Sequence, residues 1–378
     1  MNGRERVLLA LAHREADRVP IAFGTMHTSS IHVLAYRDLV RHLGIEGPTE
    51  HVADTVQQIV DPDPRLQELF RNDVASVTLS PAKPWRHQVD QDGDRWVDEW
   101  GITYYRPPGG YWYDFEGHPL RAGSIQELKA FHWPDPHDPI RTAGLHENVL
   151  SLWDSSERAI ILLGTTGGLF EQSTFLRGFE ELLVDMKLRP SFVEELAERL
   201  LEWQVASWEE ALARVGRRIH LVALADDLGH NKGLLFSPEL FRRIYKPRLI
   251  QLTASIRTKT EAKIWFHSCG AISEVIPDLI EVGVEVLDPV QVSARGMDSA
   301  SLKREFGKDL SFWGGGCHTL VLNSGSPNQV REEVRRRIGD FAPGGGYVFT
   351  PGHNIQFGVP PENILALYDA AIEFGSYT

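Results

Sequence analysis

The sequence has few cysteines, no long apolar run and no excess of positive charge. Only two of its 378 residues are cysteine, which excludes a disulfide framework and fits a reducing cytoplasm. No apolar run approaches the roughly 18 residues of a membrane-spanning helix, so we expect no membrane partner. The net charge of −13 argues against binding to nucleic acid or to an anionic membrane.

The chain does contain a repeated strand-and-helix pattern. Eight short β-rich segments recur with helical patterns between them, and most are nearly continuous apolar runs, as in strands covered on both faces. The predicted strands are RVPIAF (18–23), DVASVTL (73–79), AIILLG (159–164), RIHLVAL (218–224), KIWFHS (263–268), VEVLDPV (284–290), LSFWGGG (310–316) and GYVFTPG (346–352). This alternation predicts a single-domain α/β structure over residues 1–378, a (β/α)8 TIM barrel. A doubly wound open sheet is the alternative, but no G-x-G-x-x-G motif follows the first strand.

The segment between the second and third predicted strands, residues 80–151, interrupts this pattern. It is rich in Trp, Tyr, Pro and Gly, as in RWVDEWGITYYRPPGGYWYDFEGHPL. A structureless loop of this length is uncommon in a compact domain. We therefore expect an aromatic-rich β-hairpin insert after strand two that acts as a lid over one end of the barrel. Its exposed aromatic side chains also favour a homodimer.

The C-terminal ends of the predicted strands carry both cysteines and several histidines. In a (β/α)8 barrel the active site is built at these ends. The stretch KIWFHSCGAI delivers His267 and Cys269 two residues apart, just past strand five. Thiolate and imidazole together are typical zinc ligands. We predict a zinc site with the candidate ligands His267, Cys269, Cys317 and His353, although each of these residues taken alone is more often structural.

Other polar residues follow the same strand ends. Three of them are poorer candidates for direct ligands, and we predict that they orient the ligands, occupy the open metal position until substrate arrives, or take part in the reaction: Asp226, Asp227 and Gln291. Capping of the loop after strand four is the alternative role for the two aspartates. We assign substrate contacts to His27, Thr165, His230, His318 and Asn354.

With these residues in place, the chain resembles the uroporphyrinogen decarboxylase superfamily. The resemblance runs from RERVLLALAHREADRVPIAFG through DDLG, HSCG and WGGGCHT to GGYVFTPGHNIQ, and it covers nearly the whole chain. It implies a (β/α)8 barrel. True decarboxylases of this superfamily carry an Arg-Gln-Ala-Gly-Arg motif whose arginines hold substrate carboxylates. The region reads FGTMHTSSIHVLAYRDL here, without that arginine pair. Asp73 falls near the catalytic aspartate of the decarboxylases, but its place at the start of a strand favours a structural role.

The zinc-dependent methyltransferases that work with methyl-corrinoid proteins are the more similar branch. Their His-x-Cys signature matches His267-Ser268-Cys269, and their downstream Pro-Gly-Cys loop corresponds to Pro351-Gly352-His353. His353 therefore stands in place of a cysteine. Gln291 falls where some of these enzymes have a glutamate near the zinc.

This resemblance implies Zn²⁺ as cofactor and methyl transfer between a small O-, N- or S-methyl compound and methylcobalamin or another corrinoid. A nitrogen-rich ligand set favours an oxygen- or nitrogen-bound methyl group. The chain has no D-x-H-x-x-G corrinoid loop, so we expect a separate corrinoid protein as partner. Two alternatives remain. One is a metal-free decarboxylase of a carboxylated substrate, with Asp or His as the acid. The other is a non-catalytic barrel whose four ligands close the metal site.

Overall fold

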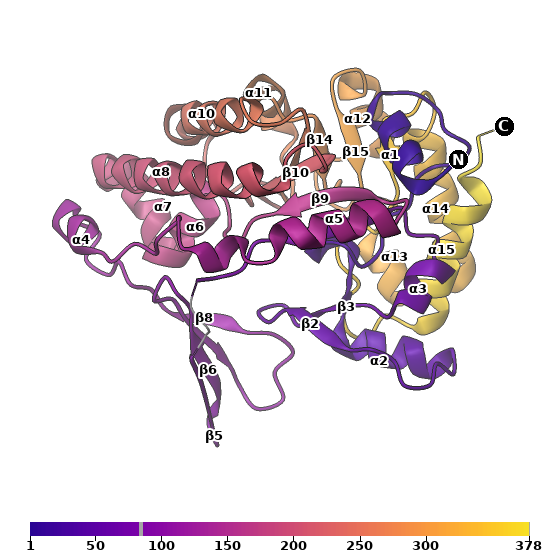
Figure 1. The fold of residues 1–378 in the computed structure, drawn as a ribbon, viewed down its shortest axis with the longest axis horizontal. Helices are drawn as coiled ribbons and strands as arrows, with labels where there is room; N and C mark the ends of the chain where they lie inside the picture. Colours follow the sequence, from indigo (N-terminus) through magenta and orange to yellow (C-terminus); the bar gives the residue numbers. More distant parts are fainter. Residues whose placement is uncertain (83–85, 378) are drawn as a thin grey trace.

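The computed structural model describes residues 1–82 and 86–377, and a parallel β-sheet forms its centre (Figure 1). Seven strands follow one another in sequence order across this sheet, each hydrogen-bonded to the next. They are β4 (Val74–Thr78), β9 (Ala159–Leu163), β10 (Leu221–Ala225), β13 (Lys263–His267), β14 (Val286–Asp288), β15 (Ser311–Trp313) and β16 (Tyr347–Val348). Each lies within or next to a segment predicted as strands two to eight, and the predicted fold class is confirmed.

The first predicted strand is an extended segment that lies between the two edges of this sheet. The amide of Ala22 donates to the carbonyl of Phe349 (2.9 Å), just past β16, and the amide of Phe349 donates to the carbonyl of Pro20 (2.8 Å). On its other side, the amide of Asp73, just before β4, donates to the carbonyl of Ile21 (2.8 Å). The segment therefore occupies the eighth position of the barrel, although its pairing is limited to an isolated bridge at Ile21.

Helices cover the outside of the sheet. Figure 1 shows α8, α10 and α11 on one side of it and α14 with α15 on another. The helices that follow the strands are α5 (Leu145–Ser155), α6 (Leu169–Arg177), α7 (Phe179–Leu188), α8 (Pro190–Val215), α9 (Pro238–Leu240), α10 (Lys246–Arg257), α11 (Ile276–Val282), α12 (Ser299–Phe306), α13 (Thr319–Ser324), α14 (Pro327–Phe341) and α15 (Pro361–Phe374). Side-chain caps start several of them: Asp298 accepts from the amide of Ser301 at α12, and Ser326 forms a capping box with Gln329 at α14.

The hydrophobic core has two parts, inside and outside the barrel. The inner part includes Trp265 and Trp313, and the first helix, α1 (Gly3–Leu11), adds Val7 and Leu11 to it. These two side chains lie with residues at the starts of strands, such as Val74, so α1 packs against the N-terminal end of the barrel. The larger outer part fills the space between strands and helices. The opposite, C-terminal end is left for polar residues.

Among the described residues, three small antiparallel sheets are added to the barrel, and the smallest is the pair β11 (Gly229–His230) and β12 (Gly233–Leu234). The second is built from β1 (Ile31–His32), β2 (His51–Asp54) and β3 (Ile59–Asp61), next to α2 (Val33–His42) and α3 (Pro64–Leu69). The third lies in the predicted insert and has four strands: β5 (Arg86–Asp90), β6 (Gly93–Val97), β7 (Thr103–Arg106) and β8 (Asp114–Gly117), followed by α4 (Ile125–Ala130). Figure 1 shows the four-stranded sheet projecting from the barrel on the side where β2 also lies. The boundaries of the insert and its role as a lid stay predictions.

Among the described residues, none of the helices has the length and apolar character needed to cross a lipid bilayer.

Candidate functional site

The His-x-Cys segment lies at the C-terminal end of β13 and begins inside the barrel. Trp265 belongs to the inner core, and because side chains alternate along a strand, His267 points inwards as well. The chain then turns at Gly270, whose φ is +89°. A Cβ atom there would lie 2.4 Å from the backbone carbon of Gly229, so only glycine allows the loops after β10 and β13 to approach so closely.

Three side chains form a group with the geometry of metal ligands. Ligand atoms of Asp227, His267 and Cys269 all lie within 4.8 Å of one another, and among the described residues this is the one such group of His, Cys, Asp and Glu. The Nε2 atom of His267 lies 3.2 Å from Oδ1 of Asp227 and 3.7 Å from Sγ of Cys269. From the sequence we rate Asp227 as a poorer candidate for a direct ligand than the histidines and cysteines; in the structure its Oδ1 atom is close enough to His267 to share a metal ion with it.

The spacing of these atoms fits a zinc ion. With bonds of about 2.3 Å to sulfur and about 2.0 Å to nitrogen or oxygen, tetrahedral geometry separates neighbouring ligand atoms by about 3.3 to 3.6 Å. The two separations at His267 Nε2, 3.2 and 3.7 Å, are close to these values. Nitrogen, thiolate and carboxylate ligands together are also a set that zinc accepts. The residues present can therefore hold the metal that the sequence predicts.

The other two predicted ligands have different positions. His353 lies near Cys269, whose thiol pKa it lowers, but it is not part of the group of three. Cys317 is fully buried in the outer core, and its sulfur lies 3.6 Å from the carbonyl oxygen of His318. Its nearest charged neighbours are Glu333 and Arg337 of α14, not the residues of the ligand group. The structure brings His353 close to Cys269 and leaves Cys317 outside the ligand group, because the glycines after β15 let the chain turn the Cys317 side chain towards the helices.

The thiol and imidazole of this group stabilise each other's charged forms. Burial raises the pKa of the Cys269 thiol, but the adjacent His267 and His353 outweigh burial, and the net pKa is lowered. Burial lowers the pKa of His267, but the Cys269 sulfur and the Asp227 carboxylate raise it well above its usual value. Without a metal, the group therefore favours a thiolate–imidazolium pair.

Asp226, next in the chain to Asp227, caps the N-terminus of a helix. It is completely buried, and its two oxygens accept from the amides of Phe170 (3.0 Å) and Glu171 (2.7 Å) at the start of α6. A Cβ atom at Gly168 would lie 2.3 Å from Cγ of Asp226, so glycine is required for this contact. Burial raises the pKa of Asp226 to about 7, against these hydrogen bonds. Asp226 therefore has a capping role, but it caps the start of α6 after strand three and not the loop after strand four, which was the alternative considered for the two aspartates.

Glu171 is a site residue that the sequence did not single out. It lies in the first turn of α6, and the carboxylates of Asp227 and Asp226 act on its carboxyl group. Burial, then repulsion from these two aspartates, raises its pKa to about 8. The sequence does contain a signal that could have identified Glu171: it lies three residues after the Gly167-Gly168 pair at the end of strand three.

Gln291 holds the His-x-Cys loop from the neighbouring strand end. Its Oε1 atom accepts from the amide of Gly270 (2.8 Å), and its Nε2 atom donates to Oδ1 of Asn231 (2.8 Å). A second clamp comes from Asp227, whose Oδ1 accepts from the amide of Cys269 (2.8 Å). These contacts fix the loop backbone, and a catalytic role for Gln291 stays a prediction.

The five residues predicted to contact substrate are spread over a wider area. Thr165 has a buried hydroxyl without a hydrogen-bond partner, and Asn354 donates to Gln57 (2.8 Å) beside His353. His27 is largely exposed and lies 3.3 Å from Asp54, and His230 is an exposed residue of β11 (Gly229–His230), which pairs with β12 (Gly233–Leu234). His318 caps α13 and faces a separate surface cavity of about 640 Å³ beside α14.

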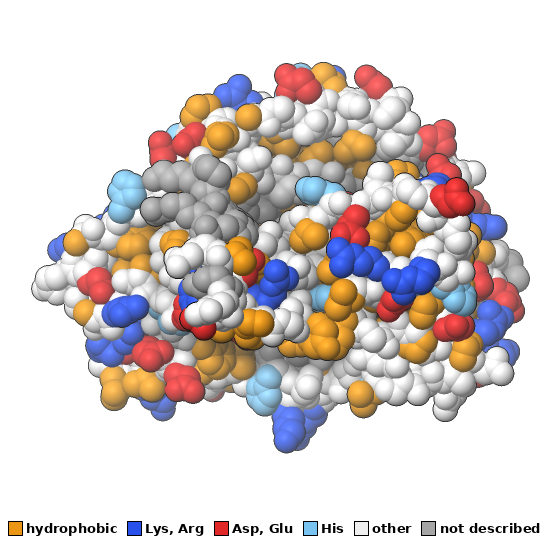
Figure 2. Space-filling view, turned by 90° about the horizontal axis from the view of Figure 1, so that it is seen from below, with side chains coloured by type: hydrophobic (Ala, Val, Ile, Leu, Met, Phe, Trp, Pro, Cys, Tyr) orange, Lys and Arg blue, Asp and Glu red, His pale blue; other side chains and the backbone are white. Residues whose placement is uncertain are grey.

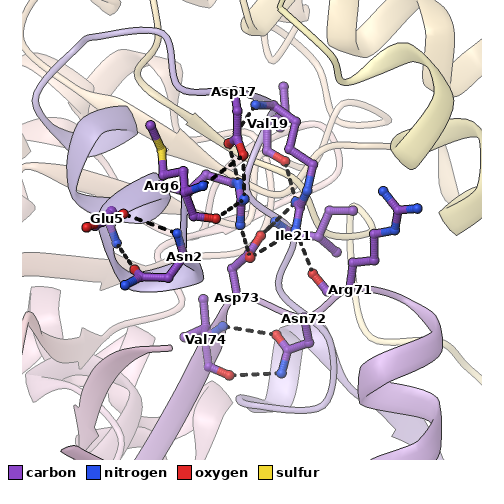
Figure 3. A network of polar contacts seen from close by, with 12 residues as sticks. Asn2, Glu5, Arg6, Asp17, Val19, Ile21, Arg71, Asn72, Asp73 and Val74 are labelled. Atoms are coloured by element: carbon purple, nitrogen blue, oxygen red, sulfur yellow. Dashed lines mark hydrogen bonds and ion pairs between the residues drawn. The ribbon is translucent and has the colours of Figure 1, made fainter. Parts of the chain in front are cut away.

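Asp73 lies in a structural network at the opposite end of the barrel (Figure 3). Its carboxylate receives Arg6 at 2.6 Å and Arg18 at 2.8 Å, and it also accepts from the amide of Ile21 (2.9 Å). Figure 3 shows Arg6 reaching both Asp17 and Asp73. Asp73 therefore joins α1, the first extended segment and β4, as its position at a strand start suggests.

The surface around the insert carries charges of both signs. Figure 2 shows the molecule from the side on which the β5–β8 sheet projects, with Lys and Arg side chains interspersed among Asp, Glu and hydrophobic ones. A cavity of about 850 Å³ within the insert, beside α4, is lined by acidic and apolar side chains, among them Glu99, Trp100 and Phe131. The described residues on this face therefore mix both charges with apolar side chains.

Comparison with known proteins gives a consistent result. Residues 114–374 match the sequence profile of the family described as Uroporphyrinogen decarboxylase (URO-D). Uroporphyrinogen decarboxylase from Alkalilimnicola ehrlichii is 23% identical, over 97% of this chain and 93% of the relative. The protein of the same name from Neisseria meningitidis serogroup C is 21% identical, over 70% and 73%. A solved structure of a methyltransferase from Methanosarcina mazei has a TM-score of 0.65 at 17% identity, covering 99% of each chain, and so shares the fold.

Proposed function

Because the chain belongs to the uroporphyrinogen decarboxylase family, we propose that it is the zinc-dependent kind of enzyme within this fold, a methyltransferase. It would move a methyl group between a small O-, N- or S-methyl compound and a corrinoid carried by a separate protein. The observation that carries this proposal is the ligand group of Asp227, His267 and Cys269 at the C-terminal end of the barrel. The shared fold with a protein named as a methyltransferase supports the same reaction class.

Each residue of the group would contribute differently to metal binding. Bound zinc would supply a Lewis acid for the heteroatom that carries the methyl group, or would hold a thiol substrate as its thiolate. Cys269 is prepared for binding by its lowered pKa. Three protein ligands leave a fourth position for water or substrate, which is the pattern of a catalytic zinc site. His353, beside Cys269, borders that position or completes the set.

The charges around the group favour a substrate without a carboxylate. Four carboxyl groups lie in or next to the site: Glu171, Asp226, Asp227 and Asp288. The charged neighbours that act most strongly on the ligand group are these acids, the thiol and the two histidines, without a lysine or an arginine among them. Such a site attracts a metal cation and a neutral or cationic substrate, and it repels a polycarboxylate.

Metal analysis of the purified protein tests the proposal. Wild-type protein prepared without added zinc or chelator is expected to contain about one zinc per chain, and Cys269→Ala less than about a tenth of that. Cys317→Ala is the matched control, because it removes the other cysteine and is expected to leave zinc unchanged. Zinc-loaded protein is then incubated with methylcobalamin and a thiol, or with reduced cobalamin and methyl ethers or methylamines, while the corrinoid absorbance is followed. Full activity of metal-free Cys269→Ala would overturn the proposal.

A metal-free decarboxylase is the second candidate, favoured by the names of the relatives with similar sequences. This alternative predicts decarboxylation that persists after chelation and needs no corrinoid. It also needs a substrate-facing acid. Asp73 is held by two arginines at the other end of the barrel, so Asp227 or Glu171 would have to take this role. Uroporphyrinogen turnover by zinc-free protein would favour the decarboxylase over the methyltransferase.

A further inference from the structure

Asp288, the last residue of β14, is a buried carboxylate beside the ligand group. It is completely buried, and among the described residues one of its oxygens, Oδ1, has no hydrogen-bond partner. The other, Oδ2, lies 3.2 Å from Nδ1 of His267, and the side chain of Thr28 is also near this carboxylate. A buried carboxylate with an oxygen left unpaired is costly for stability. Its presence is therefore explained better by what it does to His267 than by stabilisation of the fold.

The two nitrogens of the His267 ring have different neighbours. Nδ1 faces Asp288, whereas Nε2 faces Asp227 at 3.2 Å and Cys269 at 3.7 Å. A carboxylate accepts hydrogen bonds but does not donate them when ionised. Asp288 therefore favours a proton on Nδ1 and leaves the lone pair of Nε2 directed at the other two ligands.

The sheet register places Asp288 at this point. His267 and Asp288 are paired residues of the adjacent parallel strands β13 and β14, so their side chains leave the same face side by side. The backbone adds a second link, because the amide of Ser268 donates to the carbonyl of Asp288 (2.7 Å). The carboxylate is thus held rigidly relative to the imidazole that it contacts.

We propose that Asp288 is a positioning residue for the metal: it fixes the tautomer and orientation of His267 so that Nε2 can bind. This inference rests on the proposed zinc site and adds a residue that does not touch the ion. Partners of this kind change metal affinity by about 10- to 100-fold when they are removed.

Competition with a chromophoric chelator measures the effect on metal affinity. Asp288→Asn keeps the size of the side chain but removes its charge, and we expect its zinc affinity to fall by about 10- to 100-fold. Cobalt-substituted protein gives a second readout, because the visible absorption bands of Co²⁺ report ligand geometry. We expect these bands to shift in Asp288→Asn, which a purely structural role elsewhere in the fold would not cause.

Asp278→Asn is the matched control for zinc affinity. Asp278 is also buried, but it lies on α11 and its oxygens accept from Arg242 and Lys246 instead of a histidine. We expect this variant to keep zinc affinity within about threefold, well below the effect of a partner of the ligand. Folded Asp288→Asn with wild-type zinc affinity and unchanged cobalt bands would overturn the inference. Absence of zinc binding in the wild type would instead refute the proposed function on which it rests.

Discussion

Aspartates lie at both ends of the barrel, and their partners differ. At the N-terminal end, Asp73 is paired with the guanidinium groups of Arg6 and Arg18 (Figure 3). At the C-terminal end, Asp227 lies 3.2 Å from His267 and is surrounded by further acids. In the first region the buried negative charge has positive partners. In the second, several carboxyl groups share one buried site, and burial raises the pKa of Glu171 to about 8 and that of Asp226 to about 7.

This difference separates a structural role from a functional one. Opposite charges that satisfy each other hold segments together, and breaking such a buried pair costs the fold several kcal/mol. Like charges that are kept close together destabilise the folded protein, and they are retained where a cation or a reaction needs them. The residue type is the same, so the partners decide the role. Replacing one aspartate at each end makes the comparison quantitative.

The largest differences in zinc affinity and in free energy of unfolding are expected between Asp227→Asn and Asp73→Asn. Asp227→Asn removes a ligand charge, so zinc affinity should fall by more than about 100-fold, beyond the loss of an outer partner. In the metal-free protein its free energy of unfolding should fall by only about 1 kcal/mol, because the amide loses the charge attraction to His267 but keeps an oxygen that accepts from the amide of Cys269. Asp73→Asn should lower the free energy of unfolding by about 3 kcal/mol and leave zinc affinity unchanged.

Chelator competition and urea denaturation of the metal-free variants provide both quantities for each protein. The two ends have different roles only if each variant loses a different property. Asp227→Asn should lose zinc affinity, and Asp73→Asn should lose folding stability. A comparable loss of stability in both variants, with zinc retained by Asp227→Asn, would show that the two aspartates have the same structural role.

The strand ends were predictable from the sequence because apolar runs and their spacing determine them. All seven named strands of the barrel lie within or beside the predicted segments, and His267, Cys269 and Asp227 follow β13 and β10 as expected from the barrel. The direction of a side chain depends on register, which apolar patterning specifies only where strands are long. Strand β15 has three residues, and the glycines after it let the chain turn Cys317 outwards.

Residues that reach the site from a helix or from a neighbouring strand were harder to predict. Glu171 arrives from the first turn of α6, so its position depends on how Gly168 packs against Asp226. Asp288 contacts His267 because β13 and β14 are in register, and that pairing is a property of the sheet. Both depend on contacts between segments far apart in the chain, which local patterns do not encode.

Glu171→Gln is expected to change the free energy of unfolding by an intermediate amount, and this change depends on pH. The usual pKa of 4.5 is raised to about 8 in the folded protein, mainly by burial. Between these values the folded state holds a proton that the unfolded chain releases, so wild-type stability falls as pH rises through this range. The glutamine side chain of the variant has no such proton to lose.

Urea denaturation of the metal-free proteins at several pH values measures this difference. Near pH 4.5 the two proteins should be about equally stable, and above about pH 8 Glu171→Gln should be more stable by about 1 to 3 kcal/mol. The matched control is Glu116→Gln, whose carboxylate forms an exposed pair with Arg95 and should show no such gain. Equal pH dependence of wild type and Glu171→Gln would mean that Glu171 is not held among the acids of the site.

The smallest change in free energy of unfolding is expected for a substitution where the insert contacts the barrel. Tyr111, in the loop between β7 and β8, stacks on Phe357 at 3.8 Å between ring centroids, and its carbonyl contacts Nε2 of His32 at 2.9 Å. Phe357 follows His353 by four residues in the loop after β16. Tyr111→Ala removes the stacked ring and keeps the backbone contact, so the free energy of unfolding should fall by about 1 kcal/mol.

Steady-state kinetics of the same variant test the lid. If the insert covers the site, loosening this contact should raise KM a few-fold while zinc content and the thermal midpoint stay near those of wild type, because loop closure contributes to substrate binding more than to metal binding. Val89→Ala is the control, since Val89 lies in the same sheet but is 73% exposed. A Tyr111→Ala variant with wild-type KM would leave the insert as a structural addition to the barrel, since its stacked contact with the loop after β16 would then have no effect on substrate.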